Sequence, residues 1–363
     1  MASRARSRLA GPSRNPVSAG VDGVATLEIH AATGRAASSD DPRVAGDGPL
    51  RGRVGEIQRA RILTAMGEVV RERGAGEVTV AHVVARSGVS RRTFYELFAD
   101  REDCFLAAFD LAVARAGESV LPAYRAAGRW RERVRGGLEA LLVFLDYEPE
   151  LGYLCVVGAL GAGGRALERR TRVAQALVAV VHEGCGECRA ARQPNRLVAE
   201  GVVGAVLSVI HARMVSGSGR GEGRAAKPLL GLLNPLMGMV VLPYLGAAAA
   251  ERELRRPAAK PRAPVRSRGN PLRELDMRLT YRTVRVLLAI AELGGRGSNP
   301  SNRQVATAAG ISDQGQISKL LARLHALGLI ENSGGDHAKG EANAWALTTS
   351  GDDVARTIQI QKN

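Results

Sequence analysis

Residues 78–109 read VTVAHVVARSGVSRRTFYELFADREDCFLAAF, and this stretch decides the fold. A short segment of helical apolar spacing follows Thr79, which predicts a helix that starts there. The turn Ser87-Gly88-Val89 comes next, and its glycine supplies the backbone freedom that a tight turn needs. Ser90 is a favourable N-cap for another helix, which we expect to run to Phe98. The pattern therefore predicts two short helices joined by a tight turn.

The second of these helices combines a polar tip with an apolar back. Its first turn is formed by four polar residues: Ser90, Arg91, Arg92 and Thr93. The opposite side carries three apolar residues: Phe94, Leu97 and Phe98. In a helix-turn-helix, the second helix enters the major groove of DNA with its N-terminal end. Arginine there offers a planar fork of donors that fits phosphates and guanine edges. The stretch therefore predicts a DNA-reading helix-turn-helix.

This stretch resembles the tetracycline-repressor (TetR) family of transcriptional regulators. The resemblance depends on nine residues: Thr79, Val83, Gly88, Val89, Ser90, Thr93, Tyr95, Phe98 and Glu102. Ser87 departs from the usual alanine of the family and Cys104 from the usual aliphatic residue, and neither change threatens the fold. Arg101 stands where the family usually has lysine, at the start of the fourth helix, and either cation can meet a phosphate.

The resemblance implies a role for each matching polar residue. Arg91, Arg92 and Thr93 would contact bases or nearby phosphates. Tyr95 would hydrogen-bond a phosphate, and Thr79 would anchor the start of the second helix against the backbone.

An apolar stripe upstream predicts the first helix of this domain. The stripe begins after Glu56 and consists of Ile62, Leu63, Met66, Val69 and Val70. Gly74 and Gly76 then end the helix. Residues 1–52 contain no Phe, Trp or Tyr and are rich in Arg, Ala, Gly, Ser and Pro, so we predict a disordered tail. The helix-turn-helix domain is expected over residues 53–100.

Residues 101–250 are interpreted as a helical ligand-binding and dimerisation domain. Asp100 is expected to cap its first helix, with Glu102 and Asp103 near the positive N-terminal end. Aromatic residues make up only 4% of the chain against 45% apolar residues, so the core must consist of Ala, Val and Leu, which favours helices. The apolar segments 195–216 and 228–250 are the candidates for the dimer interface. The predicted fold class is therefore all-α.

Residues 251–275 are predicted to form a basic, proline-rich linker. Its prolines prevent regular structure: Pro257, Pro261, Pro264 and Pro271. The segment is either a solvated spacer or a stretch that lies along DNA phosphates, and its composition fits both.

Residues 276–355 show the order of a winged helix, three helices followed by a β-hairpin. The first helix is indicated by Leu279, Val286, Leu287 and Ile290, and the second covers Asn302–Ala309. Ser312 or Asp313 caps the third. The extended pieces Leu329–Asn332 and Ala344–Leu347 then flank a glycine-rich tip.

Residues 303–332, RQVATAAGISDQGQISKLLARLHALGLIEN, are similar to the winged helix of the multiple-antibiotic-resistance-regulator (MarR) type. The residues expected to face DNA are Gln314, Gln316, Ser318, Lys319 and Arg323, with His337 and Lys339 at the wing tip. Glutamine can read adenine through two hydrogen bonds. The alternative is a winged helix that binds a protein partner.

The segment His182-Glu183-Gly184-Cys185-Gly186-Glu187-Cys188 is the remaining candidate site. A Cys-x-x-Cys pair with a histidine three residues before it is compatible with zinc binding or a redox switch. No second pair follows at zinc-finger spacing, so a loop with two incidental thiols is the alternative. We predict no metal site, no cofactor and no catalytic residues, because no nucleophile and base show a recognisable spacing.

The remaining bulk properties fit a cytoplasmic regulator. The net charge of +15 is compatible with nucleic-acid binding and also with simple solubility. The uncharged stretch 228–250 approaches membrane-spanning length, but Asn234, Pro235 and Pro243 interrupt it, so we predict no membrane span. The predicted function is a DNA-binding transcriptional regulator, most simply a homodimeric repressor of a near-palindromic operator. By resemblance to the family, an unknown small-molecule effector would release it from DNA.

Overall fold

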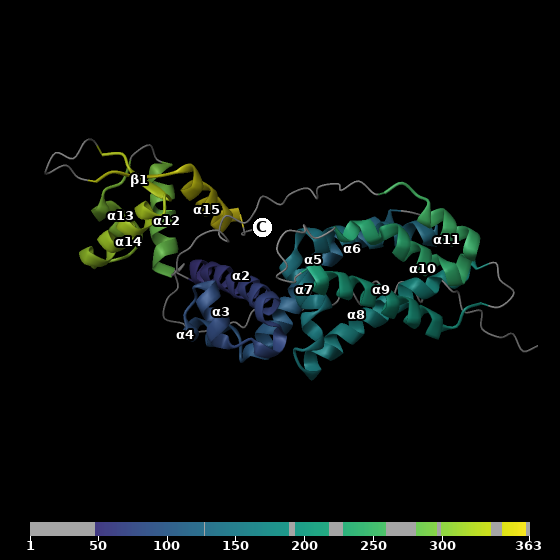
Figure 1. The fold of residues 1–363 in the computed structure, drawn as a ribbon. Coiled ribbons are helices and arrows are strands. Elements are labelled where there is room, and N and C mark those ends of the chain that lie inside the picture. The colour runs from purple at the N-terminus through teal and green to yellow at the C-terminus, as the bar shows by residue number, and fades with distance from the viewer. Residues whose placement is uncertain are drawn as a thin grey trace, which may run out of the picture. The chain divides into compact units, whose positions relative to one another are not determined.

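The structure, a computed structural model, describes residues 48–126, 128–188, 193–217, 228–258, 281–295, 299–334 and 343–360 of the 363-residue chain. They form two compact units (Figure 1). Residues 109–258 make up the helical unit. The second unit contains an N-terminal head, residues 48–108, and a winged domain, residues 281–360. The described elements are helices apart from two short strands, which confirms the predicted all-α class with a small hairpin.

The N-terminal head has the predicted helix order. It consists of α2 (Gly48–Arg73), the 3₁₀ turn η1 (Ala75–Glu77), α3 (Val80–Ser87), α4 (Arg91–Leu97) and the start of α5 (Arg101–Arg125). Gly88, between α3 and α4, has a φ of 66°, a left-handed conformation that glycine adopts without steric cost. The core of the head is made of residues from all these helices: Ile62, Leu63, Met66, Val83, Phe94 and Phe105.

The first helix is longer than the sequence pattern predicts. α2 begins at Gly48 rather than after Glu56, so residues 48–52 belong to a helix and not to the predicted tail. The apolar residues Val54 and Ile57 of this extension are buried, and burial of an apolar face stabilises a helix beyond its own propensity. The rest of the predicted tail, residues 1–47, lies outside the described residues.

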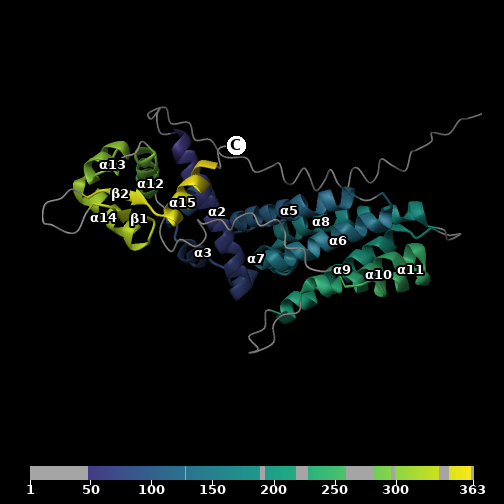
Figure 2. The same cartoon turned by 90° about the horizontal axis from the view of Figure 1, so that it is seen from above.

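The winged domain has three helices and a hairpin, as predicted (Figure 2). The helices are α12 (Tyr281–Gly294), α13 (Asn302–Ala308) and α14 (Gln314–Ala326). Strands β1 (Ile330–Asn332) and β2 (Trp345–Leu347) pair antiparallel, with Ile330 opposite Leu347. A last helix, α15 (Thr349–Ile360), was not predicted. His337 and Lys339 of the predicted wing tip lie outside the described residues.

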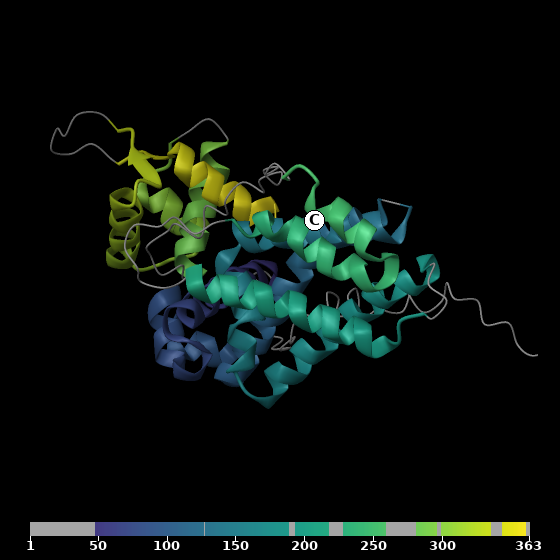
Figure 3. The same ribbon diagram turned by 45° about the vertical axis from the view of Figure 1, so that its right-hand side comes forward.

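The helical unit packs α5 against a bundle of further helices. These are α6 (Trp130–Tyr147), α7 (Pro149–Val156), α8 (Gly164–His182), α9 (Arg196–Gly217), α10 (Leu233–Leu245) and α11 (Ala247–Leu254), with 3₁₀ turns η2 (Gly158–Leu160), η3 (Glu183–Glu187) and η4 (Leu229–Leu232). Figure 3 shows α9, in teal, and the green pair α10 and α11 along one face of this bundle. The core is aliphatic, as the low aromatic content predicts, with Trp130 as its largest buried side chain.

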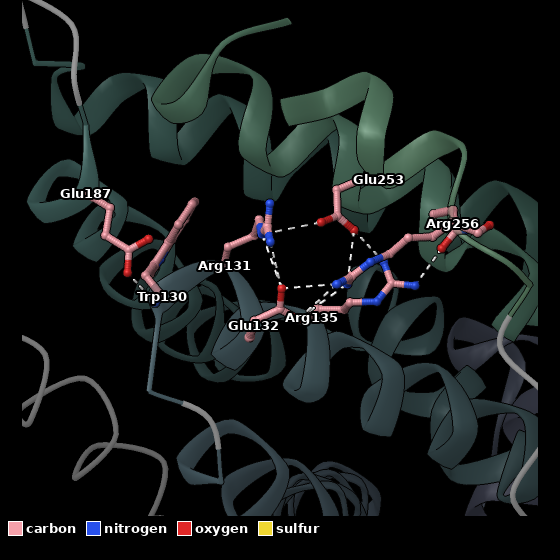
Figure 4. Close-up of polar contacts among 8 residues, drawn as sticks. Trp130, Arg131, Glu132, Arg135, Glu187, Glu253 and Arg256 are labelled. Carbon is pink, nitrogen blue, oxygen red and sulfur yellow. Dashed lines mark hydrogen bonds and ion pairs between the residues drawn. The ribbon is translucent and has the colours of Figure 1, made fainter. Parts of the chain in front are cut away.

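The predicted linker starts later than residue 251. Residues 251–254 belong to α11, and the Glu253 side chain is only 1% exposed. Its carboxylate accepts a hydrogen bond from Arg135 at 2.5 Å and lies 3.6 Å from both Arg131 and Arg256 (Figure 4). Arg256 also donates to Glu132 at 3.1 Å. Because a buried charge must be paired, this network fixes residues 251–256 to α6 and makes them part of the helical unit. Residues 259–275 lie outside the described residues.

Among the described residues, α9 is the one helix that is long and apolar enough to cross a membrane, with a mean hydropathy of 1.6 over its best window. The stretch examined in the sequence, residues 228–250, instead forms the shorter elements η4, α10 and α11, with a break at Gly246. One exposed face of α9 carries uncharged side chains, from Leu197 to Val215, whereas Arg196, Glu200 and Arg213 are exposed on other sides of the helix.

Candidate nucleic-acid interface

The start of α4 has a capped, rigid geometry. The Ser90 hydroxyl accepts a hydrogen bond from the Thr93 backbone N–H at 3.1 Å, which confirms the predicted N-cap. The two hydroxyls of Ser90 and Thr93 also lie 2.9 Å apart. Phe94 is fully buried and Phe98 nearly so, and their rings pack with centroids 5.6 Å apart. The apolar back of α4 therefore holds its polar tip in one orientation.

The polar tip of α4 faces solvent. Arg91 and Arg92 are exposed, and Tyr95 keeps 58% of its surface accessible although its ring packs edge-on against Phe94. Arg92 is paired with Glu96 at 2.9 Å, but its side chain is 89% exposed. Such exposed pairs contribute little energy, so a phosphate can replace Glu96 as the partner of Arg92. Cations and a phenol hydroxyl thus project from one exposed helix end.

Thr79 and Arg101 have partners within the head. The Thr79 hydroxyl accepts from the His82 backbone N–H at 3.3 Å and caps α3. Arg101 donates to the carbonyl oxygen of Ala75 at 2.9 Å, which connects the start of α5 to the turn before α3. Arg101 therefore has a clear structural role. A guanidinium has further N–H donors, and its predicted phosphate contact stays a prediction.

Two arginines that the sequence interpretation missed connect the helices of the head. Arg86 of α3 binds Glu72 at 2.6 Å and Glu68 at 3.1 Å, both on α2. These hydrogen bonds raise the pKa of Arg86. Arg59 of α2 lies over the ring of Phe98, 5.6 Å from its centroid. The i, i+4 spacing of the two glutamates was the only sequence signal, and it does not indicate a partner on another helix.

The corresponding helix of the winged domain, α14, presents a different set of groups. Asp313 caps it by accepting from the Gln316 backbone N–H at 3.1 Å, which decides between the two predicted caps. The side chains of Gln314, Ser318, Lys319 and Arg323 are exposed, and Gln316 is half-buried. The Ser318 hydroxyl donates to the carbonyl oxygen of Gln314 at 2.9 Å. Lys319 and Arg323 share one face at i, i+4 spacing.

The N-terminal head has the helix order, the glycine turn and the exposed basic helix end of a helix-turn-helix. Residues 62–108 match the profile of the bacterial regulatory proteins of the tetR family. This TetR-type head is of the DNA-binding, helix-turn-helix class of transcription regulators. Its two departures from the family pattern are harmless. Ser87 is buried and its hydroxyl accepts from the Val89 N–H at 3.3 Å, while Cys104 is buried and burial raises its pKa. The MarR resemblance of the winged domain stays a prediction.

Solved structures of the same class resemble this chain weakly. A TetR family transcription regulator from Marinobacter aquaeolei VT8 has 21% identity and a TM-score of 0.40, covering 52% of this chain and 96% of that one. The fatty acid degradation regulator FadR from Bacillus halodurans has 15% identity and a TM-score of 0.44, covering 51% and 94%. RolR, solved with resorcinol, has 21% identity and a TM-score of 0.37, covering 58% and 98%. No curated protein sequence matches the chain.

The helical unit contains two adjoining apolar cavities. They measure about 100 Å³ and about 130 Å³ and share five lining residues: Val120, Leu121, Leu141, Leu177 and Leu207. Tyr124 lines the smaller cavity, but its hydroxyl already donates to Glu183 at 2.8 Å. Cys155 lines the larger cavity and donates to the Phe109 carbonyl oxygen at 3.8 Å, and Arg170 is the one charged residue in either lining. The cavities are therefore suited to an apolar guest.

Cys185 lies in the turn η3 and Cys188 directly follows it, and the acidic residues beside the two thiols fix this turn. Glu187 accepts from the Trp130 backbone N–H at 2.6 Å (Figure 4), and Glu183 accepts from Arg133 at 2.6 Å. Cys185 donates to the Pro194 carbonyl oxygen at 3.3 Å, and burial raises its pKa, which disfavours a reactive thiolate. Within the described part of the chain, no group of three or more His, Cys, Asp or Glu side chains is arranged to hold a metal ion.

Proposed function

We propose that this protein is a homodimeric transcriptional regulator that inserts α4 of each protomer into the major groove of a near-palindromic operator, most simply as a repressor. The observation that carries this proposal is the exposed tip of α4, where Arg91, Arg92 and Tyr95 project from a helix whose back is buried through Phe94. Base contacts from the helix start would give specificity, and phosphate contacts would give an affinity that falls steeply with salt.

The test is selection of bound fragments from genomic DNA, followed by footprinting. We expect a near-palindrome whose half-sites lie about one helical turn, or a multiple of it, apart. Arg91→Ala should weaken binding to the selected site by about tenfold. Arg172→Ala is the matched control, because it removes the same charge from an exposed position of α8. Equal affinity of the Arg91→Ala variant and the wild type would exclude α4 as the reading helix.

Dimerisation is supported by a continuous uncharged face on α9. Six exposed positions follow the helical repeat on this face: Leu197, Gly201, Gly204, Ser208, Ala212 and Val215. The exposed charged residues Arg196, Glu200 and Arg213 lie outside it. On α10, which packs against α9, the exposed positions are Pro235, Met239 and Leu242. Contiguous apolar surface of this kind marks protein interfaces, and small residues allow two helices to approach closely. These helices are the ones expected from the apolar segments of the sequence.

Gly204→Arg tests this interface, since a Cβ at Gly204 meets nothing within 4 Å in one protomer. We expect its mass by light scattering to fall from twice the 38.3 kDa of the chain to that of one chain. Gly161→Arg, at another glycine with open space, is the control and should remain dimeric. If the Gly204→Arg variant remained dimeric, the dimer interface would have to lie elsewhere than on this face of α9.

The effector of this regulator is proposed to be an uncharged apolar molecule bound in the two cavities. Burying a polar group without a hydrogen-bond partner costs several kcal/mol, and dry apolar cavities bind hydrocarbons such as benzene. α5 supports a coupling to DNA, because this one helix begins in the TetR-type head and lines the larger cavity further along, at Ala112, Ala116 and Val120.

Thermal unfolding with benzene, phenol and benzoate tests the chemistry of the cavities. Benzene should raise the melting temperature by a few degrees, about 2–4 °C per kcal/mol, whereas phenol and benzoate at equal concentration should not. Gly117→Leu, which places a side chain in the larger cavity, should remove the benzene effect. Stronger stabilisation by benzoate would instead assign Arg170 as the partner of an acidic effector.

The winged domain is proposed to be a second DNA-reading element, supported by the exposed Gln314, Lys319 and Arg323 of α14. The combination with the TetR-type head would produce a bipartite operator. A winged helix that binds a protein partner is the alternative, and charge reversal of Lys319 and Arg323 separates the two, as described in the Discussion.

A further inference from the structure

The first helix of the winged domain is buried on more than one side. From Thr283 to Ile290, α12 has six buried residues: Thr283, Val284, Val286, Leu287, Ala289 and Ile290. Neighbouring positions in a helix point about 100° apart, so this run cannot form a single stripe. A helix that is apolar over most of its circumference needs cover from several elements.

The cover comes from two parts of the chain. Within the winged domain, α13, α14, α15 and β2 contact α12. The other contact is α2, whose residues Val54 and Ile57 belong to the same apolar cluster as Val284 and Leu287. Val54 is 3% exposed and Ile57 2%. Their i, i+3 spacing puts them on one face of α2, so the N-terminal turns of α2 contribute an apolar patch to the winged-domain core.

The same helix is part of the TetR-type head. α2 is continuous over 26 residues, and beyond Ile57 its residues Ile62 and Met66 are fully buried in the head. From Val54 to Met66 an α-helix rises about 18 Å. No proline interrupts α2 between Val54 and Met66, so we expect no sharp kink there, and the two patches on α2 keep a nearly constant separation.

We propose that the N-terminal extension of α2 is a docking surface for the winged domain of the same chain, and that it holds α4 and α14 in one body that reads a composite DNA element of fixed spacing. The docking follows from the shared apolar cluster alone. The composite reading also rests on the proposed DNA-binding function of the winged domain.

Hydrogen–deuterium exchange of the full chain without DNA tests the docking. In the double variant Val54→Asp/Ile57→Asp, two carboxylates replace the buried patch, so the amides of α12 should exchange about tenfold faster or more. The amides of α3 and α4 should be unchanged, which shows that the head is still folded. Glu56→Ala, an exposed change between the two positions, is the control and should have no effect on α12.

Should the aspartates unfold the head, Val54→Ala/Ile57→Ala gives the same comparison with a milder change, and faster exchange confined to α12 again supports docking. Unchanged exchange of α12 in variants with a folded head would overturn it.

DNA binding then tests the composite reading separately. In the selected operator, inserting 5 base pairs between the footprints of the two domains turns them by about half a helical turn. Wild type should lose about tenfold or more in affinity, whereas Val54→Asp/Ile57→Asp should bind both operators within about threefold. Equal tolerance of the insertion by both proteins would overturn the composite reading while leaving the exchange result intact. A chain that selects no DNA at all would instead contradict the proposed function.

Discussion

Helices α4 and α14, the two proposed DNA-reading helices, share one architecture and differ in chemistry. Ser90 caps α4 and Asp313 caps α14, and in each helix the fourth residue after the cap is fully buried. These anchors are Phe94 and Ile317. The positions between cap and anchor are Arg91-Arg92-Thr93 in α4 but Gln314-Gly315-Gln316 in α14. The same support therefore presents cations in one case and neutral amides in the other.

This chemical difference predicts that the two helices contribute unequally to the affinity for DNA and to its sequence specificity. The tip of α4 carries two arginines and a neutral cap, which suits close approach to phosphates. The tip of α14 carries a carboxylate, Asp313, and its cations come six and ten residues later, at Lys319 and Arg323. We therefore expect the TetR-type head to supply most of the salt-dependent affinity and α14 to add base discrimination.

Truncation of the buried anchors Phe94 and Ile317 should have the largest effect on stability. Phe94→Ala removes a fully buried ring and should lower the local unfolding free energy of the TetR-type head by about 3–5 kcal/mol. Ile317→Ala should cost the winged domain about 2–5 kcal/mol. Amide exchange of α3 and of α13 reports the two domains separately. Equal destabilisation of both domains by either variant would contradict the assignment of one anchor to each reading helix.

Charge reversal at the two tips should have unequal effects on DNA affinity. Arg91→Glu/Arg92→Glu should weaken binding by about 100-fold or more and flatten the salt dependence, because two phosphate or base contacts become repulsive. Lys319→Glu/Arg323→Glu should cost about tenfold. Titrations at several salt concentrations measure both. No loss of affinity in the second variant would favour the protein-partner alternative for the winged domain.

The hydroxyl groups of Tyr95 and Ser318, each about one turn from the start of its helix, should also contribute differently to DNA binding. Tyr95→Phe removes an exposed hydroxyl predicted to bind a phosphate and should weaken DNA binding by about three- to tenfold, the equivalent of about 0.5–1.5 kcal/mol. Ser318→Ala should change affinity little, because the Ser318 hydroxyl already donates to Gln314 within the helix. Binding titrations measure both effects, and unchanged melting temperatures show that the variants are folded. A larger loss of affinity in Ser318→Ala than in Tyr95→Phe would contradict the expected difference.

Removing either N-cap should change stability less than removing a buried anchor, and the loss should be similar in the two domains. Ser90→Ala and Asp313→Ala should each destabilise their own domain by about 1 kcal/mol. Their effects on DNA should diverge, since Asp313→Ala also removes a negative charge from the reading tip. We expect Ser90→Ala to weaken binding slightly and Asp313→Ala to preserve it. Weaker binding of the Asp313→Ala variant, in a folded winged domain, would indicate that Asp313 contacts a base.

The sequence predicts the local features of this fold well. The caps at Ser90 and Asp313, the glycine turn at Gly88 and the helix–hairpin order of the winged domain all depend on interactions within a few residues. The exposed basic tip of α4 belongs to the same category, because helical periodicity alone separates Arg91 from Phe94. Features of this kind are determined by residues that are close together in the sequence, so they can be predicted without knowing any distant contact.

The features that escaped prediction depend on distant partners. Val54 and Ile57 lie in a segment rich in Arg and Gly, and only a second apolar surface explains their burial. The hydrogen bond from Arg101 to the carbonyl oxygen of Ala75 was not predicted either. Glu253 pairs with Arg135 across more than a hundred residues. Periodicity carries no information about such pairs, since each partner looks like an ordinary surface residue in its own helix.

The pairing of Glu253 decides where this chain can be divided for separate study. A truncation after Ala250 would remove the Glu253 carboxylate that pairs with Arg135 of α6, whereas Arg131 would keep its ion pair with the neighbouring Glu132. An arginine that loses its partner at a partly buried site destabilises the packing around it. A cut beyond Arg256 keeps the whole ionic cluster with α6. Experiments that isolate the helical unit should therefore retain residues 251–256, which composition alone would have assigned to the linker.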